Sequence, residues 1–334
     1  MIRTLQALRF IAAFAIVVYH ATRQFVLKSD NDFLNTLYSF LQTKLEFGVD
    51  IFFVISGYVI YSSYQKRKKS PLEFIADRII RIAPMYWITT MIFVIILSMN
   101  FSLYPLSDLS FLSIIKSLMF IPAYNLEGIY LPVHSVGWSL NIEMMFYAVF
   151  ALAIVLNSNN VKVIVFPSII LIYLAGNNYE SLSFYHNVMV FEFLAGCCIA
   201  MINADTLKFI SKRTFISAII IMCCIASLIY GNAQLRLLYW GVPSFFIVLL
   251  CVSFDHKIKV SDWLMTLGAA SYSLYLTHRI IITLTIWVFG RGNYSLWLAL
   301  LSVVISIPAS VIMYLKLEKP LSSNLKRIRI SSYA

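Results

Sequence analysis

TLQALRFIAAFAIVVYH, residues 4–20, is an apolar run of helix length that carries Arg9 and His20 at internal positions. Ionisable side chains are costly in lipid, and each one inside a membrane segment is by default a candidate functional residue that faces a bundle interior or an aqueous cavity. At the helical rise, the two side chains lie roughly 16 Å apart along the axis. We therefore expect one helix to present a cation near one membrane face and a possible base towards the other.

The composition of the chain predicts an all-α integral membrane protein. Of its 334 residues, 60% are hydrophobic and 12% are charged, and the mean hydropathy is +0.83. Lys and Arg outnumber Asp and Glu by 26 to 15. The excess lies in short segments between apolar runs, which favours control of membrane topology over nucleic-acid binding. We therefore expect no nucleic-acid partner. Because no metal-ligand spacing is visible, we also expect no bound metal.

Ten apolar runs are near the length that crosses the hydrocarbon core. An eleventh candidate, residues 109–124, contains Lys116 and Pro122, and counting it as a span would move the basic segment 208–213 outside. Ten spans place every basic segment inside, as the positive-inside rule prefers. We therefore predict about ten transmembrane helices, both termini cytoplasmic, a single membrane domain over residues 1–334, and a long external segment, 100–138, that is partly helical or re-entrant. The spans are 5–27, 47–64, 82–99, 139–156, 161–176, 187–203, 214–230, 236–254, 271–289 and 295–316.

Three ionisable residues are expected in the outer half of the bilayer. His20 lies far along an outward-running helix, and Asp50 lies near the start of the returning one, in FGVDIFFVISGY. A carboxylate can fix the tautomer of a histidine and raise its basicity, as a general base requires, but such a pair can also serve helix packing alone. Arg23 is a second possible partner for Asp50. Glu143 begins the fourth span from the same side and is a candidate catalytic residue that orients an acceptor or assists proton transfer, with pairing to an arginine as the alternative.

The segment DRIIRIAPMYW places Arg78 and Arg81 three residues apart at the expected cytoplasmic mouth of the third span. On a helix the two guanidinium groups share one face. Each offers a rigid fork of donors that suits phosphate oxygens. The alternative is anchoring to anionic membrane lipid.

The segment SYSLYLTHRI brings Ser271, Tyr275 and His278 to one helical face, which can line a cavity with two hydroxyls and an imidazole. A histidine that only bonds a neighbouring carbonyl is the competing interpretation for His278. His134 falls in an external segment, where we expect solvent exposure. Glu192 lies inside the sixth span and requires either a partner or a proton.

Taken together, these residues resemble the acyltransferase family 3 membrane proteins, which are multi-spanning enzymes that modify bacterial polysaccharides and related envelope glycans. The likeness is closest to the exopolysaccharide-modifying branch. Many relatives carry a further soluble esterase-like domain, and none is expected here. The resemblance is carried by five motifs in order: LQALRFIAAFAIVVYH (5–20), FGVDIFFVISGYVI (47–60), the Arg-x-x-Arg of Arg78 and Arg81, WSLNIEMMFY (138–147) and SYSLYLTH (271–278).

The resemblance implies an O-acyltransferase, most simply an O-acetyltransferase, in the bacterial cytoplasmic (inner) membrane. Acetyl-CoA or another short acyl-CoA would be the cytoplasmic co-substrate, with no bound cofactor. The acceptor would be a hydroxyl of an extracytoplasmic polysaccharide or lipid-linked saccharide.

The resemblance also implies roles for the candidate residues. Arg78 and Arg81 would hold the acyl-CoA phosphates, with Arg9 as a further candidate. His20 would act as the base or as a transiently acylated nucleophile. Asp50 would orient His20 and Glu143 would position the acceptor. The candidate substrate-binding residues are Trp138, Ser139, Ser271, Tyr275 and His278.

Two other functions use the same buried charges. A transporter or flippase for an acyl donor or sugar lipid often shows two related halves with broken helices at matching positions, and no such repeat is visible. A polysaccharide polymerase would favour an arginine-rich external loop, whereas residues 100–138 contain one Lys and no Arg.

Overall fold

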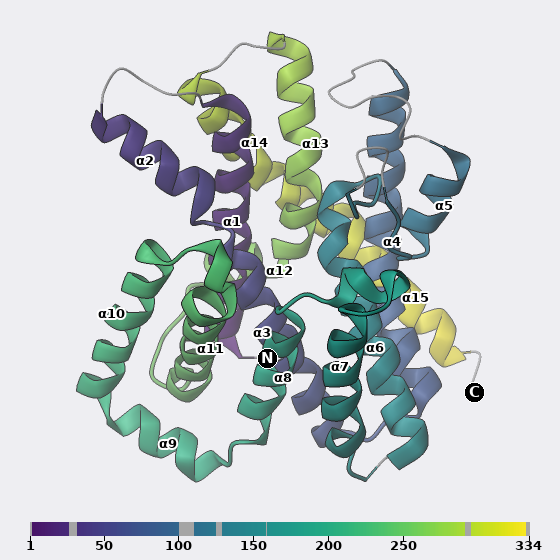
Figure 1. Cartoon of the computed structure of the whole chain (residues 1–334), viewed down its shortest axis with the longest axis vertical. Helices are drawn as coiled ribbons and strands as arrows, with labels where there is room; N and C mark the ends of the chain where they lie inside the picture. Colours follow the sequence, from purple (N-terminus) through teal and green to yellow (C-terminus); the bar gives the residue numbers. More distant parts are fainter. Residues whose placement is uncertain are drawn as a thin grey trace. The chain divides into compact units, whose positions relative to one another are not determined.

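The computed structural model describes residues 2–26, 32–99, 110–124, 129–157, 159–290 and 295–331, and these ranges are helical with no β-strand (Figure 1). Within them, seven helical segments are long and apolar enough to cross a membrane. The prediction of an all-α, multi-pass membrane protein is therefore confirmed. The seven segments are Arg3–Phe25, Leu34–Lys66, Pro71–Ser98, Ser135–Asn157, Leu237–Phe254, Ser271–Phe289 and Leu296–Arg329.

The other three expected spans coincide with helices that are bent or short. Val190–Met201 and Ala204–Lys212 meet at 94° and would make an eighth span if they are counted as one. Lys162–Gly176 and Thr214–Tyr230 are apolar but shorter than the full-length helices. Each of the ten expected runs thus falls on a helix, while seven or eight helical segments have full spanning length.

The chain divides into two compact units, each with its own internal packing. The first unit combines Met1–Lys68 with Asn187–Ser271, and the second combines Lys69–His186 with Tyr272–Ala334. Each unit therefore joins stretches that are far apart in the sequence.

The first unit is built around the close packing of α3 (Phe47–Lys66) on α8 (Val190–Met201). Glycines on both helices permit it, as is common between membrane helices. A Cβ atom added at Gly57 would lie 2.0 Å from the Phe193 carbonyl oxygen, and one at Gly196 would lie 2.1 Å from that of Val54. The remaining elements of this unit are α1 (Arg3–Phe25), α2 (Asp32–Thr43), α9 (Ala204–Lys212), α10 (Thr214–Tyr230), η4 (Ala233–Leu235), the π-helical turn η5 (Leu237–Gly241), α11 (Val242–Phe254) and α12 (Asp262–Ala269).

The second unit is organised by α4 (Pro71–Ser98), which starts eleven residues before the expected span. Ser70 and Glu73 form a capping box and Pro71 occupies the first turn, a combination that starts helices. Arg78 and Arg81 consequently lie inside a continuous helix. The other elements are α5 (Phe111–Leu118), η2 (Ser135–Gly137), α6 (Trp138–Asn157), α7 (Lys162–Gly176), η3 (Glu180–Tyr185), α13 (Ser271–Phe289, whose first residue groups with the first unit), α14 (Leu296–Met313), the π-helical turn η6 (Tyr314–Glu318) and α15 (Lys319–Ser331).

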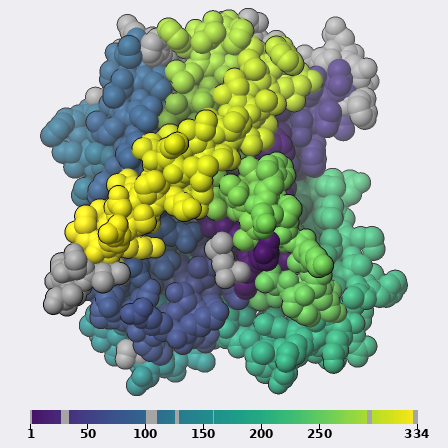
Figure 2. All heavy atoms as spheres, turned by 180° about the vertical axis from the view of Figure 1, so that it is seen from behind, coloured from purple at the N-terminus to yellow at the C-terminus, as the bar shows by residue number. Residues whose placement is uncertain are grey.

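Two peripheral helices are attached to α4. In the expected external segment, α5 supplies the helical part, and Ser117 near its end bonds the Tyr86 hydroxyl at 3.0 Å. Helix α15, coloured yellow in Figure 2, lies on the surface, and its Arg329 forms a 2.8 Å ion pair with Asp77 of α4. Residues 27, 100–109 and 125–128 of the expected spans and external segment lie outside the described residues.

Candidate functional site

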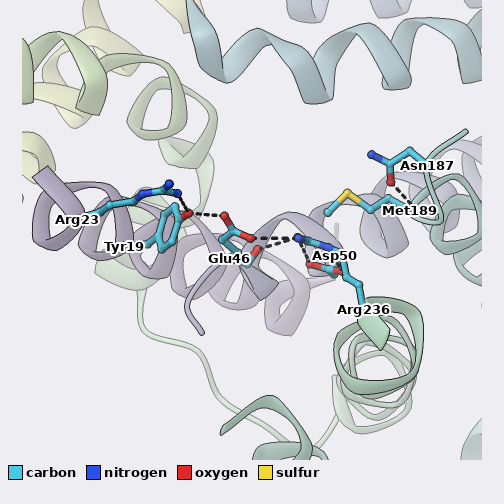
Figure 3. A network of polar contacts seen from close by, with 7 residues as sticks. All are labelled: Tyr19, Arg23, Glu46, Asp50, Asn187, Met189 and Arg236. Atoms are coloured by element: carbon cyan, nitrogen blue, oxygen red, sulfur yellow. Dashed lines mark hydrogen bonds and ion pairs between the residues drawn. The ribbon is translucent and has the colours of Figure 1, made fainter. Parts of the chain in front are cut away.

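The first unit contains a continuous chain of polar side chains that links α1, α3 and the residue preceding η5 (Figure 3). Arg236 donates from Nε to Asp50 Oδ1 at 3.0 Å and from Nη2 to Asp50 Oδ2 at 2.8 Å. Its Nη1 donates to Glu46 Oε2 at 3.2 Å. The Tyr19 hydroxyl donates to Glu46 Oε1 and accepts from Arg23 Nη1 at 2.5 Å. The chain therefore runs from Asp50 through Arg236, Glu46 and Tyr19 to Arg23.

Local structure explains why these residues meet. Glu46 is the N-cap of α3 and Asp50 lies in its first turn, one helical turn later, where negative charge complements the helix dipole. Arg236 directly precedes the wide π-helical turn η5, a geometry that is frequent at functional sites. Its guanidinium carbon lies 4.7 Å from the ring centroid of the buried Trp240.

Asp50 pairs with neither His20 nor Arg23, the two partners considered from the sequence. It is fully buried, and both of its oxygens accept from Arg236. Bidentate pairing suits a buried carboxylate because it satisfies both oxygens at once. Arg236 was missed because it lies 186 residues away, at the edge of an apolar run. The sequence signal that could have identified Arg236 is its position at the end of an expected membrane span.

Glu192 lies beside the polar network of Asp50 and Arg236. It is 1% exposed in the first turn of α8 and lies next to the Asp50 carboxyl and near Arg236. Asn187 accepts from the Met189 backbone N–H at 3.0 Å just before that helix (Figure 3). Since Arg236 already neutralises Asp50, a second ionised carboxylate here would be uncompensated. A neutral side chain at position 192 would avoid this cost.

His20 and Arg9 lie on α1 and are both partly exposed. The His20 ring packs edge-on against the Tyr19 ring, with centroids 4.9 Å apart and planes at 67°. Arg9 donates to Gln6 Oε1 at 3.2 Å, one turn earlier on the same helix.

In the second unit, three of the predicted residues act on a single hydroxyl. Tyr147 of α6 is buried and donates to Glu143 Oε1 at 2.5 Å. Arg78 and Arg81 both interact electrostatically with the same Tyr147 hydroxyl. The sequence places these arginines and Glu143 towards opposite ends of their spans. The structure instead places all three near Tyr147, because Phe74, in the extra helical turns that precede residue 82, packs against Tyr147 and Phe150 of α6.

The same unit also joins two predicted hydroxyl residues. Tyr275 of α13 bonds Ser139 Oγ at 2.8 Å and donates to the Val136 carbonyl at 2.9 Å. Trp138 is the residue before Ser139 and begins α6. The WSLNIE and SYSLYLTH motifs are therefore neighbours in space.

His278 and Ser271 are both buried on α13. His278 Nδ1 lies 3.2 Å from the Leu274 carbonyl, one turn earlier, which supports the interpretation of a hydrogen-bonded structural histidine. Its ring lies 6.0 Å from that of Tyr275. The Ser271 hydroxyl has no hydrogen-bond partner in the part of the chain that the structure describes.

His134 was expected in solvent, and this prediction is wrong. It is fully buried next to Phe93, and its Nε2 lies 2.9 Å from the Leu276 carbonyl. Burial lowers the pKa of His134 to about 4, which the hydrogen bond to Leu276 counteracts only partly. His134 is therefore neutral at physiological pH and ties the loop before α6 to α13.

The chain is similar to known proteins over most of its length. The profile of a family described as an acyltransferase domain matches residues 2–315.

The chain is 29% identical to the exopolysaccharide production protein ExoZ of Rhizobium meliloti (strain 1021), covering 82% of this chain and 88% of ExoZ. It is 25% identical to the putative peptidoglycan O-acetyltransferase YrhL of Bacillus subtilis (strain 168), covering 82% of this chain and 50% of YrhL. It is 24% identical to the peptidoglycan O-acetyltransferase OatA of Listeria monocytogenes, covering 96% of this chain and 56% of OatA. The chain thus spans about half the length of these O-acetyltransferases. No solved structure matches it.

Proposed function

The chain belongs to the acyltransferase family whose profile spans residues 2–315, and from this we propose that it is an O-acetyltransferase of a bacterial envelope polysaccharide. The family match carries the proposal. The names of its relatives support the acceptor class, since ExoZ is an exopolysaccharide production protein and OatA a peptidoglycan O-acetyltransferase. The acceptor would be a hydroxyl of an extracytoplasmic or lipid-linked saccharide.

We place the enzyme in the bacterial inner membrane with ten spans and both termini cytoplasmic. The seven full-length helical segments, the bent pair and the two shorter apolar helices support the number ten. The basic segments between apolar runs support the orientation, because positive charge is retained on the cytoplasmic side.

We assign the binding of an acyl-CoA donor to Arg78 and Arg81, with Arg9 as a further candidate. Two guanidinium forks on one face of α4 suit a diphosphate, because each fork donates two parallel hydrogen bonds. The Tyr147 hydroxyl holds the Glu143 carboxylate by a hydrogen bond. Glu143 would then help to position the acceptor while it stays tied to α6.

We assign the base to His20. It would take the proton from the acceptor hydroxyl as the oxygen attacks the thioester carbonyl, and the CoA thiolate would leave and be protonated. In a two-step variant, the His20 imidazole would be acylated first. Asp50 would act indirectly, since Arg236 occupies both of its oxygens. The acceptor would be contacted by Trp138, Ser139, Ser271, Tyr275 and His278.

Transfer of radiolabelled acetyl from acetyl-CoA to cell-surface glycan, in membranes that carry the protein, tests the proposal. The wild type and His256→Ala, which alters an exposed histidine, should label glycan, whereas His20→Ala should not at equal membrane expression. Retained labelling in His20→Ala would remove the role of His20. Movement of the label across the membrane without a covalent product would identify a transporter instead.

A further inference from the structure

We propose that Arg236 is a positioning residue, which fixes the His20 turn of α1 against the start of α3. This inference rests on the proposed function, in which His20 is the base. It assigns a role to a side chain outside the five motifs and gives the buried Asp50 a role that requires no contact with the reacting groups.

The first step is the attachment of Arg236 to α3. Two of its hydrogen bonds hold Asp50 and a third holds Glu46, one turn apart at the N-terminus of that helix. Asp50 is fully buried, and the Arg236 side chain is 15% exposed. A planar guanidinium with several donors can bridge two carboxylates in a fixed geometry, which the single ammonium of lysine cannot do.

The second step leads from α3 to α1. Glu46 uses Oε2 for Arg236 and Oε1 for the Tyr19 hydroxyl, so that one carboxylate links the two helices. The Tyr19 hydroxyl in turn accepts from Arg23, one turn further along α1. Donors and acceptors are matched at every link, and two cations alternate with two anions. The charges of these five linked side chains therefore sum to zero. The network resists rearrangement, because moving one member would leave its neighbour unpaired.

The third step leads from Tyr19 to His20. Tyr19 is 4% exposed, and its ring packs edge-on against the His20 ring with the centroids 4.9 Å apart. A buried ring that is also anchored at its hydroxyl has little rotational freedom. Its neighbour on the same helical turn is therefore held in a restricted orientation. A base must point at the proton that it removes, and a misplacement of 1 Å can cost about 100-fold in rate.

A packing role alone is the competing explanation, and kinetics separate the two. If this network of side chains only holds the helices together, breaking it lowers the amount and thermal stability of the folded protein, while the molecules that still fold transfer acetyl at the normal rate. If the network positions His20, kcat falls in folded protein while KM for acetyl-CoA stays near the wild-type value.

The variants are Arg236→Gln, Arg236→Lys, Tyr19→Phe and the double variant Tyr19→Phe with Arg236→Gln. Arg236→Gln leaves a buried carboxylate without its cation and can reduce folding. Tyr19→Phe is the milder test, since it keeps the ring and removes only the hydroxyl. The matched control is Arg3→Gln, which breaks a surface pair with Asp262 in the same unit, at 49% and 98% side-chain exposure.

Initial rates of acetyl transfer at varied acetyl-CoA, normalised to folded protein in the membrane, decide the question. We expect kcat to fall about 10- to 100-fold in Tyr19→Phe and Arg236→Gln. Arg236→Lys should not restore kcat. The kcat of the double variant should be no lower than that of the poorer single variant, because both residues act through one hydrogen-bonded network. Arg3→Gln should resemble the wild type.

Normal kcat in folded Tyr19→Phe and Arg236→Gln, or losses that multiply in the double variant, would overturn the positioning role and leave the proposed function intact. An absence of transfer by the wild type, with acetyl-CoA and glycan both present, would instead overturn the proposed function, and the positioning role with it.

Discussion

The Tyr147 hydroxyl donates a 2.5 Å hydrogen bond to Glu143, one turn earlier on α6, while Arg78 and Arg81 of α4 act on the same hydroxyl. Tyr147 thus hydrogen-bonds one carboxylate and lies within electrostatic reach of two cations. A tyrosine is well suited to this position, because its hydroxyl donates to Glu143 and so competes with ion pairing between that carboxylate and the two arginines.

Tyr147→Phe should weaken donor binding. Without the hydroxyl, Glu143 can pair with Arg78 or Arg81 and compete with phosphate for their donors. We expect KM for acetyl-CoA to rise about 10-fold, equivalent to about 1.4 kcal/mol. Tyr230→Phe, at an exposed position in the first unit, is the control. An unchanged KM would show that Glu143 does not compete for the arginines.

Replacing Arg78 and Arg81 together by Lys keeps both charges but removes the planar forks. We expect acyl-CoA affinity to fall about 10-fold or more, because bidentate phosphate recognition is lost. Equilibrium binding of CoA to purified protein measures the change. Arg213→Lys, which alters an arginine that packs on Phe209 in the other unit, should bind normally. Unchanged affinity in the double variant would leave the pair as topology residues.

Glu192→Gln should be tolerated, whereas Asp50→Asn should not. The glutamine mimics the neutral acid in size and charge, while the asparagine leaves the largely buried Arg236 without its strongest partner. We expect the free energy of unfolding to fall by about 3 kcal/mol in Asp50→Asn and by less than about 1 kcal/mol in Glu192→Gln. Thermal unfolding in detergent compares them. Equal destabilisation would mean that Glu192 is ionised.

Gly57→Ala should force α3 and α8 apart. Its Cβ would lie 2.0 Å from the Phe193 carbonyl oxygen, which is backbone and cannot turn aside. We expect a loss of about 1 to 3 kcal/mol from the free energy of unfolding. Gly196→Ala acts on the other side of the same contact and should give a similar loss. Normal thermal stability of both variants would contradict the close approach of the two helices.

Stability should decrease in mild acid because of His134. Its pKa is lowered to about 4 in the folded protein from an ordinary value of 6.5. The unfolded chain therefore binds a proton first. The contribution of His134 is complete above pH 6.5 and declines as the pH falls towards 4, with a loss of about 2 kcal/mol by pH 5.

His134→Gln does not titrate and can still donate to the Leu276 carbonyl, so its unfolding temperature should fall less than that of the wild type between pH 7 and 5. His256→Gln, at an exposed site, should follow the wild type. Parallel pH profiles of the wild type and His134→Gln would show that His134 titrates normally.

Most helices could be predicted from the sequence because a membrane span is a local signal. Each apolar run coincides with a helix, and the five motifs lie on the helices to which they were assigned. Polar helices carry no such signal, and the amphipathic α2 and α9 were not anticipated. The early start of α4 could have been read from its capping box at Ser70 and Glu73.

Partners distant in sequence could not be predicted. Asp50 and Arg236 are 186 residues apart, and only the packing of α3, α8 and η5 brings them together. The burial of His134 likewise depends on α13, more than 130 residues later in the chain. Hydropathy indicates which side chains are costly in lipid, but the side chain that compensates each one is decided by tertiary structure.

The separation of Asp50 from Arg236 also bears on how the protein is made. At 5–20 residues per second, a ribosome takes roughly 10 to 40 s to synthesise the intervening chain. During that interval α3 exists while the cation that neutralises Asp50 does not, so an ionised Asp50 in the first turn of α3 would be buried without its partner. Until the second half of its own unit emerges, the first turn of α3 therefore either carries a protonated Asp50 or stays outside the hydrocarbon core.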